Sequence, residues 1–453
     1  MGKVKAAFVL IAIVLFATMG WCGSSSGAAD IVTVQRMNNL YYKVDINMLS
    51  ASHYKIGRSL ALQIKKGVPD YEQQVDAGLK AMVDLMRGSI APLPYFNDFG
   101  IKDLVKRAKD IFTNVPKEYQ DEIRGMQSVF SSTDDTLGNG KLSQNKILIY
   151  NLAPDVMRVM SCSASAAFGS MTVSGKTIVG RNLEWYDKTL PNMAAMHAVV
   201  QIHNGRNSVV LFGFLGQMIA ISGFNASRVF GAILDSPVDR IYSLRGGERS
   251  YPMDLRYALE NQTTLQGVAD TFSGKSYAYD FNIFLADAKT SSVLEVDIHK
   301  PFCGLRTSTS KLKSKEETKV EILPWNFPDA IACVNWFTLK GTSDNTGGEW
   351  WTWDGNAPRW STFIDLYKQY SGHSKITMDA MKAIMGYNGS WWKTGCAKYG
   401  AIWRYNDDES EVQAIVMDMD TLETWVSFQP PSQHDPLQSP NYIQVFSSNP
   451  FKN

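Results

Sequence analysis

Two stretches decide how this chain folds: Ser161-Cys162-Ser163-Ala164-Ser165-Ala166-Ala167-Phe168-Gly169 and Gly180-Arg181-Asn182-Leu183-Glu184-Trp185. The first predicts an apolar strand that follows Cys162, and the second predicts a strand that brings an arginine and a carboxylate back towards its start. That layout is needed if Cys162 becomes a new N-terminus after the chain cuts itself, because one residue then carries a free thiol and a free α-amine. A buried core cysteine is the alternative interpretation, and the surrounding pattern disfavours it.

The composition describes a packed globular protein. The chain has 453 residues, enough for one large domain or two ordinary ones, and 45% of them are hydrophobic and 20% charged. A net charge of +1 leaves no electrostatic footprint for nucleic acid, so we expect no such partner. The 12 Trp, 19 Tyr and 21 Phe suit large apolar clefts, although a large core would also use them.

Residues 1–29 have the layout of a signal peptide. Two lysines precede an apolar run over 6–20, and small residues follow over 23–29. The run is short for a membrane span. We therefore expect cleavage after Ala29 and a secreted or extracytoplasmic location, lysosomal-like in a eukaryotic host. An uncleaved N-terminal membrane anchor is the alternative.

Cysteine usage points to no metal and no cofactor. The sequence holds no CxxC motif and no Cys/His cluster, and its six histidines are scattered. Export permits one disulfide among Cys303, Cys333 and Cys396, which cannot all pair with one another. Residues 135–146 resemble a calcium loop only faintly, since a leucine and Lys146 stand where oxygen ligands are needed.

The predicted secondary structure changes along the chain. Residues 31–143 are predicted to be mainly helical, because apolar residues recur at helical spacing over 54–64 and Pro116 precedes an acidic first turn. From Lys146 onward strands dominate, and the Pro-rich tail over 430–453 is expected to wrap the surface. The predicted strands are Ile147–Asn151, Ser163–Met171, Thr177–Leu183, Ala198–Ile202, Ser208–Phe214, Val229–Leu234, Asn282–Ala286, Val293–Ile298, Ala330–Val334, Ala401–Arg404, Gln413–Met417 and Thr424–Phe428. With helices predicted at Asp254–Glu260 and Met378–Met385, the pattern indicates an α+β layered fold with antiparallel sheets.

Around Cys162 the sequence resembles the acid ceramidase and N-acylethanolamine acid amidase group. It also resembles the wider family of autoproteolytic cysteine acyltransferases and amide hydrolases that includes the fungal penicillin acyltransferase. The matching stretches follow in the family's order: Ser52–Gly57 and Glu118–Met126 as helices, Lys146–Asn151 as the strand before the cut, Gly180–Trp185 as the strongest motif, and Gly213–Gly216 with Ser222–Asn225 as a Gly-rich turn.

The resemblance implies a fold and a division of the chain. The implied fold is the N-terminal-nucleophile hydrolase sandwich, an αββα arrangement of four layers with an N-terminal helical segment. A cut between Ser161 and Cys162 would leave residues 30–161 as an α fragment and residues 162–453 as the catalytic β chain. The two are expected to form one globular unit, so the cleaved α fragment is itself an expected partner.

The implied chemistry is amide hydrolysis through an acyl-enzyme on Cys162. The thiol first attacks the carbonyl of Ser161, and water resolves the thioester. The liberated α-amine, whose ordinary pKa is roughly 7.7–8.0, then serves as general base. No partner histidine is needed, because the nucleophile carries its own base. The acyl amide and its acceptor are left open, so acyl transfer stands beside hydrolysis, and contact with a membrane or lipid surface is a further expectation.

Four more residues acquire roles from the resemblance. Arg181 would lower the thiol pKa, with a structural salt bridge as its alternative role. Glu184 stands where the family usually has Asp and would hold the α-amine. Asn335 would stabilise an oxyanion, with a turn-forming role as the alternative. Arg359 matches the family's second arginine, although the gap between Asn335 and Arg359 is longer than in the family. That gap holds three tryptophans, at positions 350, 351 and 353, which form either a rim over the acyl pocket or a packed surface loop.

Asp235 departs from the pattern, because relatives carry Asn at that position. An ionised Asp would repel an oxyanion, so it either binds a cationic substrate group or marks a changed site. Together with Glu184 it favours the alternative of a non-catalytic binding relative that keeps the fold. Cys162-Ser163-Ala164 suggests a second alternative, a phospholipase B-like ester hydrolase, whereas Arg181–Glu184 fits the amidase pattern better.

Overall fold

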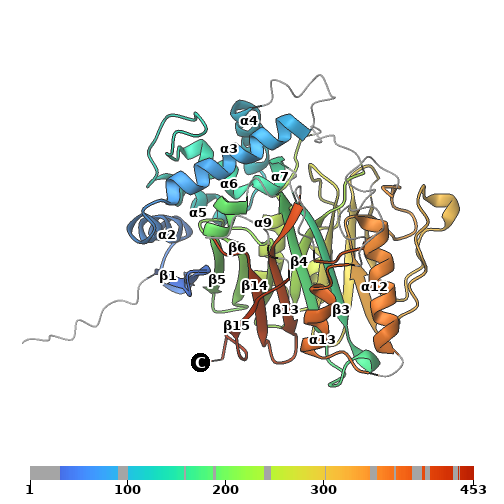
Figure 1. Ribbon diagram of the computed structural model, residues 1–453. Helices are drawn as coiled ribbons and strands as arrows, with labels where there is room; N and C mark the ends of the chain where they lie inside the picture. Colours follow the sequence, from blue (N-terminus) through green and yellow to red (C-terminus); the bar gives the residue numbers. More distant parts are fainter. Residues whose placement is uncertain are drawn as a thin grey trace, which may run out of the picture.

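Two β-sheets lie face to face, and helices pack on the outer face of each, as the ribbon of the computed structural model shows (Figure 1). The structure describes residues 31–89, 100–157, 160–186, 190–238, 246–300, 302–346, 355–371, 374–389, 400–403, 409–431, 437 and 439–452. The predicted leader over 1–29 therefore lies outside the described residues. Within them, no helix combines the length and the apolar character that a membrane span requires.

The larger sheet has nine strands, and both halves of the chain contribute to it. Its order is β1-β2-β5-β6-β7-β8-β9-β10-β11. Only β2 and β5 pair in parallel among the strand pairs described in this sheet. The strands are β1 (Val32–Met37), β2 (Tyr41–Asn47), β5 (His197–His203), β6 (Val209–Phe214), β7 (Ser222–Asn225), β8 (Phe230–Asp235), β9 (Phe281–Ala286), β10 (Ser291–Asp297) and β11 (Phe302–Arg306).

The smaller sheet has six strands, is antiparallel and contains Cys162. Its order is β12-β3-β4-β13-β14-β15. The strands are β12 (Ala330–Cys333), β3 (Met160–Ala167), β4 (Ile178–Tyr186), β13 (Glu409–Asp418), β14 (Thr424–Phe428) and β15 (Tyr442–Phe446). Alternate residues of β3 such as Cys162, Ala164 and Ala166 join the main core between the sheets, while Ala167 joins a second core beneath the outer helices.

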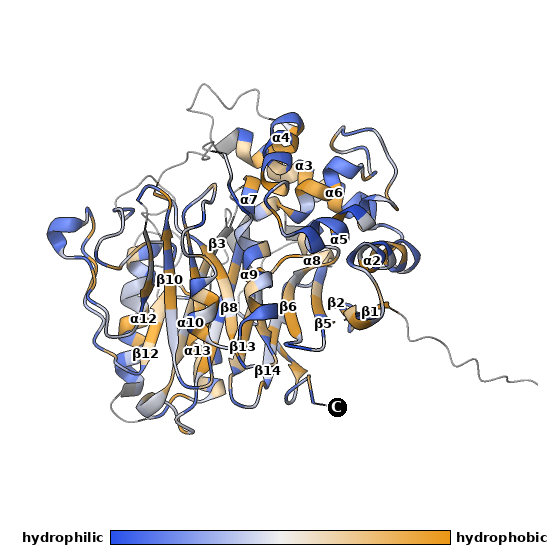
Figure 2. Cartoon of the chain, turned by 180° about the vertical axis from the view of Figure 1, so that it is seen from behind, coloured by the Kyte–Doolittle hydropathy of each residue, from blue (hydrophilic) through white to orange (hydrophobic). Residues whose placement is uncertain are grey.

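Helices complete the layers. Most of those before Cys162 gather at one end of the molecule, α9 packs on β7 and β8, and α12 and α13 cover the smaller sheet (Figure 1). The helices are α2 (His53–Gly67), α3 (Tyr71–Ser89), α4 (Ile101–Phe112), α5 (Lys117–Gln127), α6 (Gln144–Asn151), α7 (Ala153–Met157), α8 (Leu190–Ala195), α9 (Tyr251–Asn261), α10 (Leu265–Asp270), α12 (Asn356–Ser371) and α13 (Met378–Met385), with short 3₁₀ helices over Met48–Ser50, Gly169–Met171 and Lys315–Glu317. Strands such as β6 and β8 are largely apolar and the connecting loops largely hydrophilic, as hydropathy colouring shows (Figure 2). The observed layers confirm the predicted α+β sandwich of two sheets between helices.

Three secondary-structure predictions are wrong. Ile147–Asn151 is not a strand but most of α6, because the Ser143 hydroxyl caps the helix by accepting from the Lys146 N–H, and burial of the whole helix hides its period. The segment over 31–143, predicted to be mainly helical, begins instead with two strands, β1 and β2, which form a hairpin at the edge of the larger sheet. Residues 401–403 form no strand, because the N–H groups of Ile402 and Trp403 both donate to the Tyr387 carbonyl.

The C-terminal tail does more than wrap the surface. Its strand β15 pairs with β14 and becomes an edge of the smaller sheet. By contrast, the predicted helices at Met378–Met385 and Asp254–Glu260 are confirmed as α13 and as most of α9. The predicted helical stretches Ser52–Gly57 and Glu118–Met126 are likewise confirmed in α2, capped by Ser52, and in α5.

A buried ion cluster joins helices from the two sides of Cys162. The fully buried Glu122 of α5 accepts from both Nη atoms of Arg256 in α9 and from Nδ1 of His53 in α2, the last at 2.7 Å. α2 and α5 cross closely enough that a Cβ on Gly57 would lie 1.8 Å from the Glu122 carbonyl oxygen. A glycine at this crossing is therefore a condition for the two helices to approach as they do.

The cluster predicts a pH-dependent contribution to stability. The hydrogen bond to Glu122 raises the pKa of His53, whose ring is 33% exposed. A raised folded-state pKa means that the stabilisation is complete below the ordinary pKa of about 6.5 and is lost as pH rises through the raised value. We expect His53→Asn to lower the free energy of unfolding in acid by less than about 1 kcal/mol, because the pair is partly solvated, and to have a smaller effect in alkali. Urea titrations across pH measure this, with His203→Asn as control; a deficit independent of pH would contradict it.

Candidate active site

Cys162 and Arg181 face each other across neighbouring strands. In the β3–β4 register Cys162 lies opposite Leu183 and Ala164 lies opposite Arg181, so both functional side chains point to the same face of the sheet. Arg181 Nη2 lies 3.2 Å from the Cys162 Sγ and 3.2 Å from the carbonyl oxygen of Ile233 in the larger sheet. Both side chains are completely buried between the sheets. Arg181 is thus placed where it would stabilise a thiolate.

Asn335 and Arg359 hold the backbone of the same cysteine. The Cys162 N–H donates to Asn335 Oδ1 at 2.9 Å. Arg359 Nη1 donates to the Cys162 carbonyl at 3.1 Å and to Glu184 Oε1 at 2.6 Å, while its Nη2 donates to Asn335 Oδ1 at 2.9 Å. The nitrogen that a cut would turn into an α-amine therefore already has a polar acceptor in hydrogen-bond contact.

The roles differ in detail from those that the resemblance implied. Glu184 pairs with Arg359, and the oxygen bonded to the Cys162 nitrogen belongs to Asn335. The Asn335 Nδ2, the group expected to face an oxyanion, donates to the main-chain carbonyl of Asp235 at 2.6 Å. The structure therefore brings Glu184, Asn335 and Arg359 to Cys162, but assigns the contact with the cysteine nitrogen to Asn335.

Asp235 joins the site at the end of β8. Its carboxylate lies 3.4 Å from the Tyr251 hydroxyl, which also donates to the Pro154 carbonyl at 3.1 Å. The neighbouring Asp155 accepts from Ser250 Oγ at 2.7 Å, and its pKa is raised well above the ordinary value by burial, with Asp254 and Asp235 adding to the effect. Burial and the neighbouring carboxylates therefore both disfavour the ionised form of Asp155, whereas its hydrogen bonds from Ser250 and the Tyr251 N–H favour that form.

Asn356 is a site residue that the sequence did not reveal. Its Oδ1 accepts from Arg359 Nη2 at 2.9 Å and from the Asn335 N–H at 3.0 Å, and its Nδ2 donates to the Asn335 carbonyl at 3.1 Å. Asn356 is the first residue of α12, so Arg359 follows it by three residues on the same side of the helix. Pro358 in the first turn was an available signal for this helix start.

Burial dominates the acidity of the thiol in the intact chain. Burial raises the pKa of Cys162 to about 12; Arg181 and the Glu184 N–H lower it, whereas the charges of Glu184 and Asp235 raise it. The thiol is therefore protonated near neutral pH and needs a nearby base to become a nucleophile. A free α-amine on the same residue would supply one.

Other predicted features lie away from this cluster. Cys162, Cys303 and Cys333 are free thiols, so no bridge joins the two described members of the predicted disulfide set, while Cys396 and the three tryptophans at 350, 351 and 353 lie outside the described residues. The part of the chain that the structure describes holds no group of three His, Cys, Asp or Glu side chains arranged for a metal. In the loop over 135–146 the buried Lys146 Nζ donates to Asp76, Asn139 and two carbonyls at 2.7–2.9 Å, so an ammonium lies where a bound cation would.

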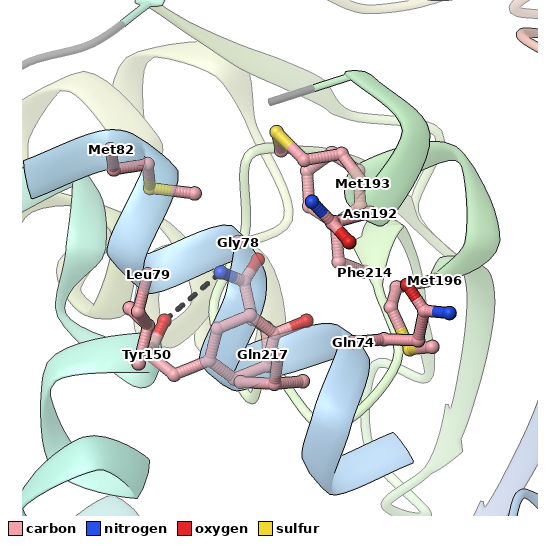
Figure 3. Close-up of a pocket in the computed structure, with 11 residues that line it drawn as sticks. Gln74, Gly78, Leu79, Met82, Tyr150, Asn192, Met193, Met196, Phe214 and Gln217 are labelled. Carbon is pink, nitrogen blue, oxygen red and sulfur yellow. Dashed lines mark hydrogen bonds between the residues drawn. The ribbon is translucent and has the colours of Figure 1, made fainter. Parts of the chain in front are cut away.

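A small apolar cavity lies among α3, α6 and α8, with β6 of the larger sheet on one side. The close-up shows its lining side chains from α3, α8 and β6, with the Gln217 amide donating to the Tyr150 carbonyl at 3.0 Å (Figure 3). Phe214 in this lining packs edge-on against Trp185 of β4, with ring centroids 6.1 Å apart. None of Cys162, Arg181, Asn335 and Arg359 is among the residues that line this cavity.

Comparison with known proteins gives structural neighbours only. No model of a known protein family matches the chain, and no curated protein sequence does. Its fold is similar to a Caenorhabditis elegans N-acylethanolamine-hydrolyzing acid amidase ortholog, at 16% identity and TM-score 0.37 over 57% of this chain and 93% of that one. It is also similar to a variant of conjugated bile acid hydrolase from Clostridium perfringens, at 11% identity and TM-score 0.35 over 63% of this chain and 97% of that one. A third similar structure is penicillin V acylase from Agrobacterium tumefaciens, at 10% identity and TM-score 0.36 over 63% of this chain and 86% of that one.

The Glu184–Arg359 pair predicts a large cost for removing the arginine. Arg359→Met would leave the buried Glu184 carboxylate without its guanidinium, so we expect a loss of about 3 kcal/mol in the free energy of unfolding. Urea unfolding in a Cys162→Ala background, which keeps the chain whole, measures the loss. Lys368→Met is the matched control, because Lys368 lies on the same helix with its side chain 65% exposed. Equal losses in the two variants would contradict a special role for Arg359.

Proposed function

We propose that this chain is a self-processing cysteine amidohydrolase that cleaves a linear N-acyl amide through an acyl-enzyme on Cys162. The observation that carries the proposal is the convergence on one residue: Arg181 contacts the thiol, Asn335 accepts from the backbone nitrogen, and Arg359 donates to the carbonyl. A structural cysteine needs none of these three contacts. A residue that serves as nucleophile and as general base needs its thiol and its nitrogen held together.

The proposed maturation is a single intramolecular acyl shift followed by hydrolysis. The Cys162 sulfur attacks the Ser161 carbonyl carbon, the bond from that carbon to the Cys162 nitrogen breaks, and the thiol proton ends on the nitrogen. Water then cleaves the thioester, leaving a carboxylate on Ser161 and a free thiol and amine on Cys162. Asn335 Oδ1, already 2.9 Å from the nitrogen, would receive a hydrogen bond from the new amine.

Substrate turnover would follow the same steps with an external amide. The α-amine takes the thiol proton, the thiolate attacks the acyl carbon, and the ammonium returns the proton to the leaving amine. Water then attacks the thioester and releases the acid, with the amine again as base. The guanidinium of Arg181, 3.2 Å from the sulfur, stabilises the thiolate, because a nearby positive charge favours the ionised form.

The two fragments would stay together after the cut. β1 and β2 precede Cys162, yet β2 pairs with β5 in the larger sheet. Glu122 and Arg256 form a buried ion pair across the same division, and Asp155 accepts from Ser250. Separating the fragments would expose these charges and a sheet edge, so the α fragment is proposed as a permanent partner of the β chain.

The proposal also covers location and substrate class. The leader over 1–29 supports export of the protein. The motifs around Cys162 that resemble the N-acylethanolamine acid amidase group support an acyl amide as the substrate, and contact of the protein with a lipid surface is proposed on the same ground.

Self-cleavage is the direct test of this function. We expect the purified native chain to run as two fragments on a denaturing gel, with Cys162 as the first residue of the larger one, and Cys162→Ala to stay whole. Cys333→Ala is the matched control, because Cys333 is an equally buried free thiol on the neighbouring strand, and it should be cut like the native chain. An uncut native chain at both acidic and neutral pH would overturn the proposal and favour a binding protein. A cut chain that hydrolyses an ester but not the paired amide would favour the phospholipase B-like alternative.

A further inference from the structure

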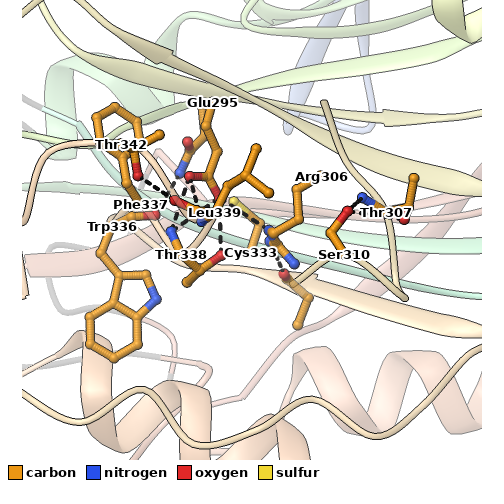
Figure 4. Close-up of polar contacts among 12 residues, drawn as sticks. Glu295, Arg306, Thr307, Ser310, Cys333, Trp336, Phe337, Thr338, Leu339 and Thr342 are labelled. Atoms are coloured by element: carbon orange, nitrogen blue, oxygen red, sulfur yellow. Dashed lines mark hydrogen bonds and ion pairs between the residues drawn. The ribbon is translucent and has the colours of Figure 1, made fainter. Parts of the chain in front are cut away.

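The segment that carries Asn335 is hydrogen-bonded to two buried charged side chains of the larger sheet, Glu295 and Arg306 (Figure 4). Glu295 of β10 accepts from the main-chain N–H groups of Thr338 and Leu339 at 3.0 Å each and from the Thr338 hydroxyl. Arg306 of β11 pairs with Glu295 at 3.1 Å and donates to the Ala332 carbonyl at 2.7 Å. The chain on either side of Asn335 is therefore held from the opposite sheet.

Asn282 completes this attachment at the position of Asn335 itself. It lies on β9 directly opposite Glu295 in the sheet register, and its side chain is fully buried. Its Nδ2 donates to the carbonyls of Val334, at 3.3 Å, and Trp336, at 3.0 Å. These carbonyls belong to the residues immediately before and after Asn335, so one amide nitrogen holds the chain on both sides of it.

We propose that Asn282 is a positioning residue that acts on Cys162 through Asn335, an inference that rests on the proposed function. Asn282 binds the carbonyls of the residues before and after Asn335, and Asn356 binds the N–H and the carbonyl of Asn335 itself. With its backbone held in this way, Asn335 Oδ1 is directed at the Cys162 nitrogen. The larger sheet thereby sets the geometry of a nucleophile that belongs to the smaller sheet.

The expected consequence is a loss of rate rather than of binding. Without Asn282 two buried carbonyls lose their donor, and the segment over 334–336 can shift. A displacement of about 1 Å at a reacting group can cost up to about a hundredfold in rate. The hydrogen bonds described for Asn282 reach Val334 and Trp336 and not Cys162, so we expect its effect to pass through Asn335.

The test is a double-mutant cycle on self-cleavage. Asn282→Leu, Asn335→Ala and the double variant are made by cell-free synthesis, and the rate at which each intact chain converts into two fragments is measured. We expect Asn282→Leu to slow cleavage at least about tenfold, and to slow it by less than about twofold in the Asn335→Ala background, because residues acting through one contact are not additive. On the fraction that is cut, kcat for dodecanoyl-7-amino-4-methylcoumarin amide should fall while KM stays within about twofold.

Asn207→Leu is the matched control for loss of stability. Asn207 is also buried, and its Nδ2 donates to two carbonyls, those of Leu259 at 2.8 Å and Gln262 at 2.7 Å. It touches no residue of the site in the contacts described for the chain. We expect cleavage and kcat close to native despite a comparable fall in the thermal midpoint. Equal slowing in the two variants, or a full tenfold effect of Asn282→Leu in the Asn335→Ala background, would overturn the positioning role.

Hydrogen exchange separates this inference from the proposed function. In a Cys162→Ala chain, which stays whole, adding Asn282→Leu should increase exchange in the peptides that contain residue 162 and residues 334–338, and adding Asn207→Leu should not. If the native chain neither cuts itself nor hydrolyses amides, the proposed function fails, while the exchange result still decides whether Asn282 holds Asn335. Unchanged exchange in both peptides would contradict the inference even in an active enzyme.

Discussion

The guanidinium of Arg359 is the interaction on which the arrangement around Cys162 depends. Its three nitrogens donate to the carbonyls of Gly355 and Cys162 and to the side chains of Glu184, Asn335 and Asn356. A charge this deeply buried is tolerated only when it is paired with an opposite charge and each of its N–H donors has an acceptor. Here the acceptors come from β3, from β4, from the chain just after β12 and from the start of the helix that carries the arginine. Because the same group touches the cysteine carbonyl and the Asn335 oxygen, the orientation of the reacting residue and the stability of the buried pair are parts of one network.

Strand pairing supplies the rest of the geometry. The antiparallel register of β3 and β4 sets Arg181 beside the thiol, and β12 ends where Asn335 can reach the cysteine nitrogen. The larger sheet then closes the site from the other side through the Ile233 and Asp235 carbonyls. The catalytic proposal therefore requires both sheets, and the buried contacts that cross from residues before Cys162 to residues after it explain how a cut chain would keep that geometry.

Much of the site could be predicted because its residues lie in short, ordered motifs. Cys162, Arg181 and Glu184 sit on adjacent strands of a hairpin, where local pairing decides proximity. Asn356 and Asn282 were not predicted, since neither belongs to a motif of the family resemblance. Their roles come only from hydrogen bonds seen in the folded chain, those of Asn356 to Asn335 and those of Asn282 to the carbonyls of Val334 and Trp336. Residues 147–151 were mistaken for a strand because a helix buried on every side shows no period of 3.6. The hairpin of β1 and β2 was missed because β2 is held in the sheet by a parallel partner, β5, far along the chain.

The measurement that tests the central claim most directly is the mass of the two fragments during turnover. The protein is mixed with dodecanoyl-7-amino-4-methylcoumarin amide in a single-turnover experiment, quenched in acid within milliseconds, and the acyl group is located by peptide mapping. We expect a dodecanoyl thioester on the first residue of the fragment that begins at Cys162, and none on the α fragment. An acyl group on any other residue, or hydrolysis undiminished after Cys162 has been alkylated, would contradict it.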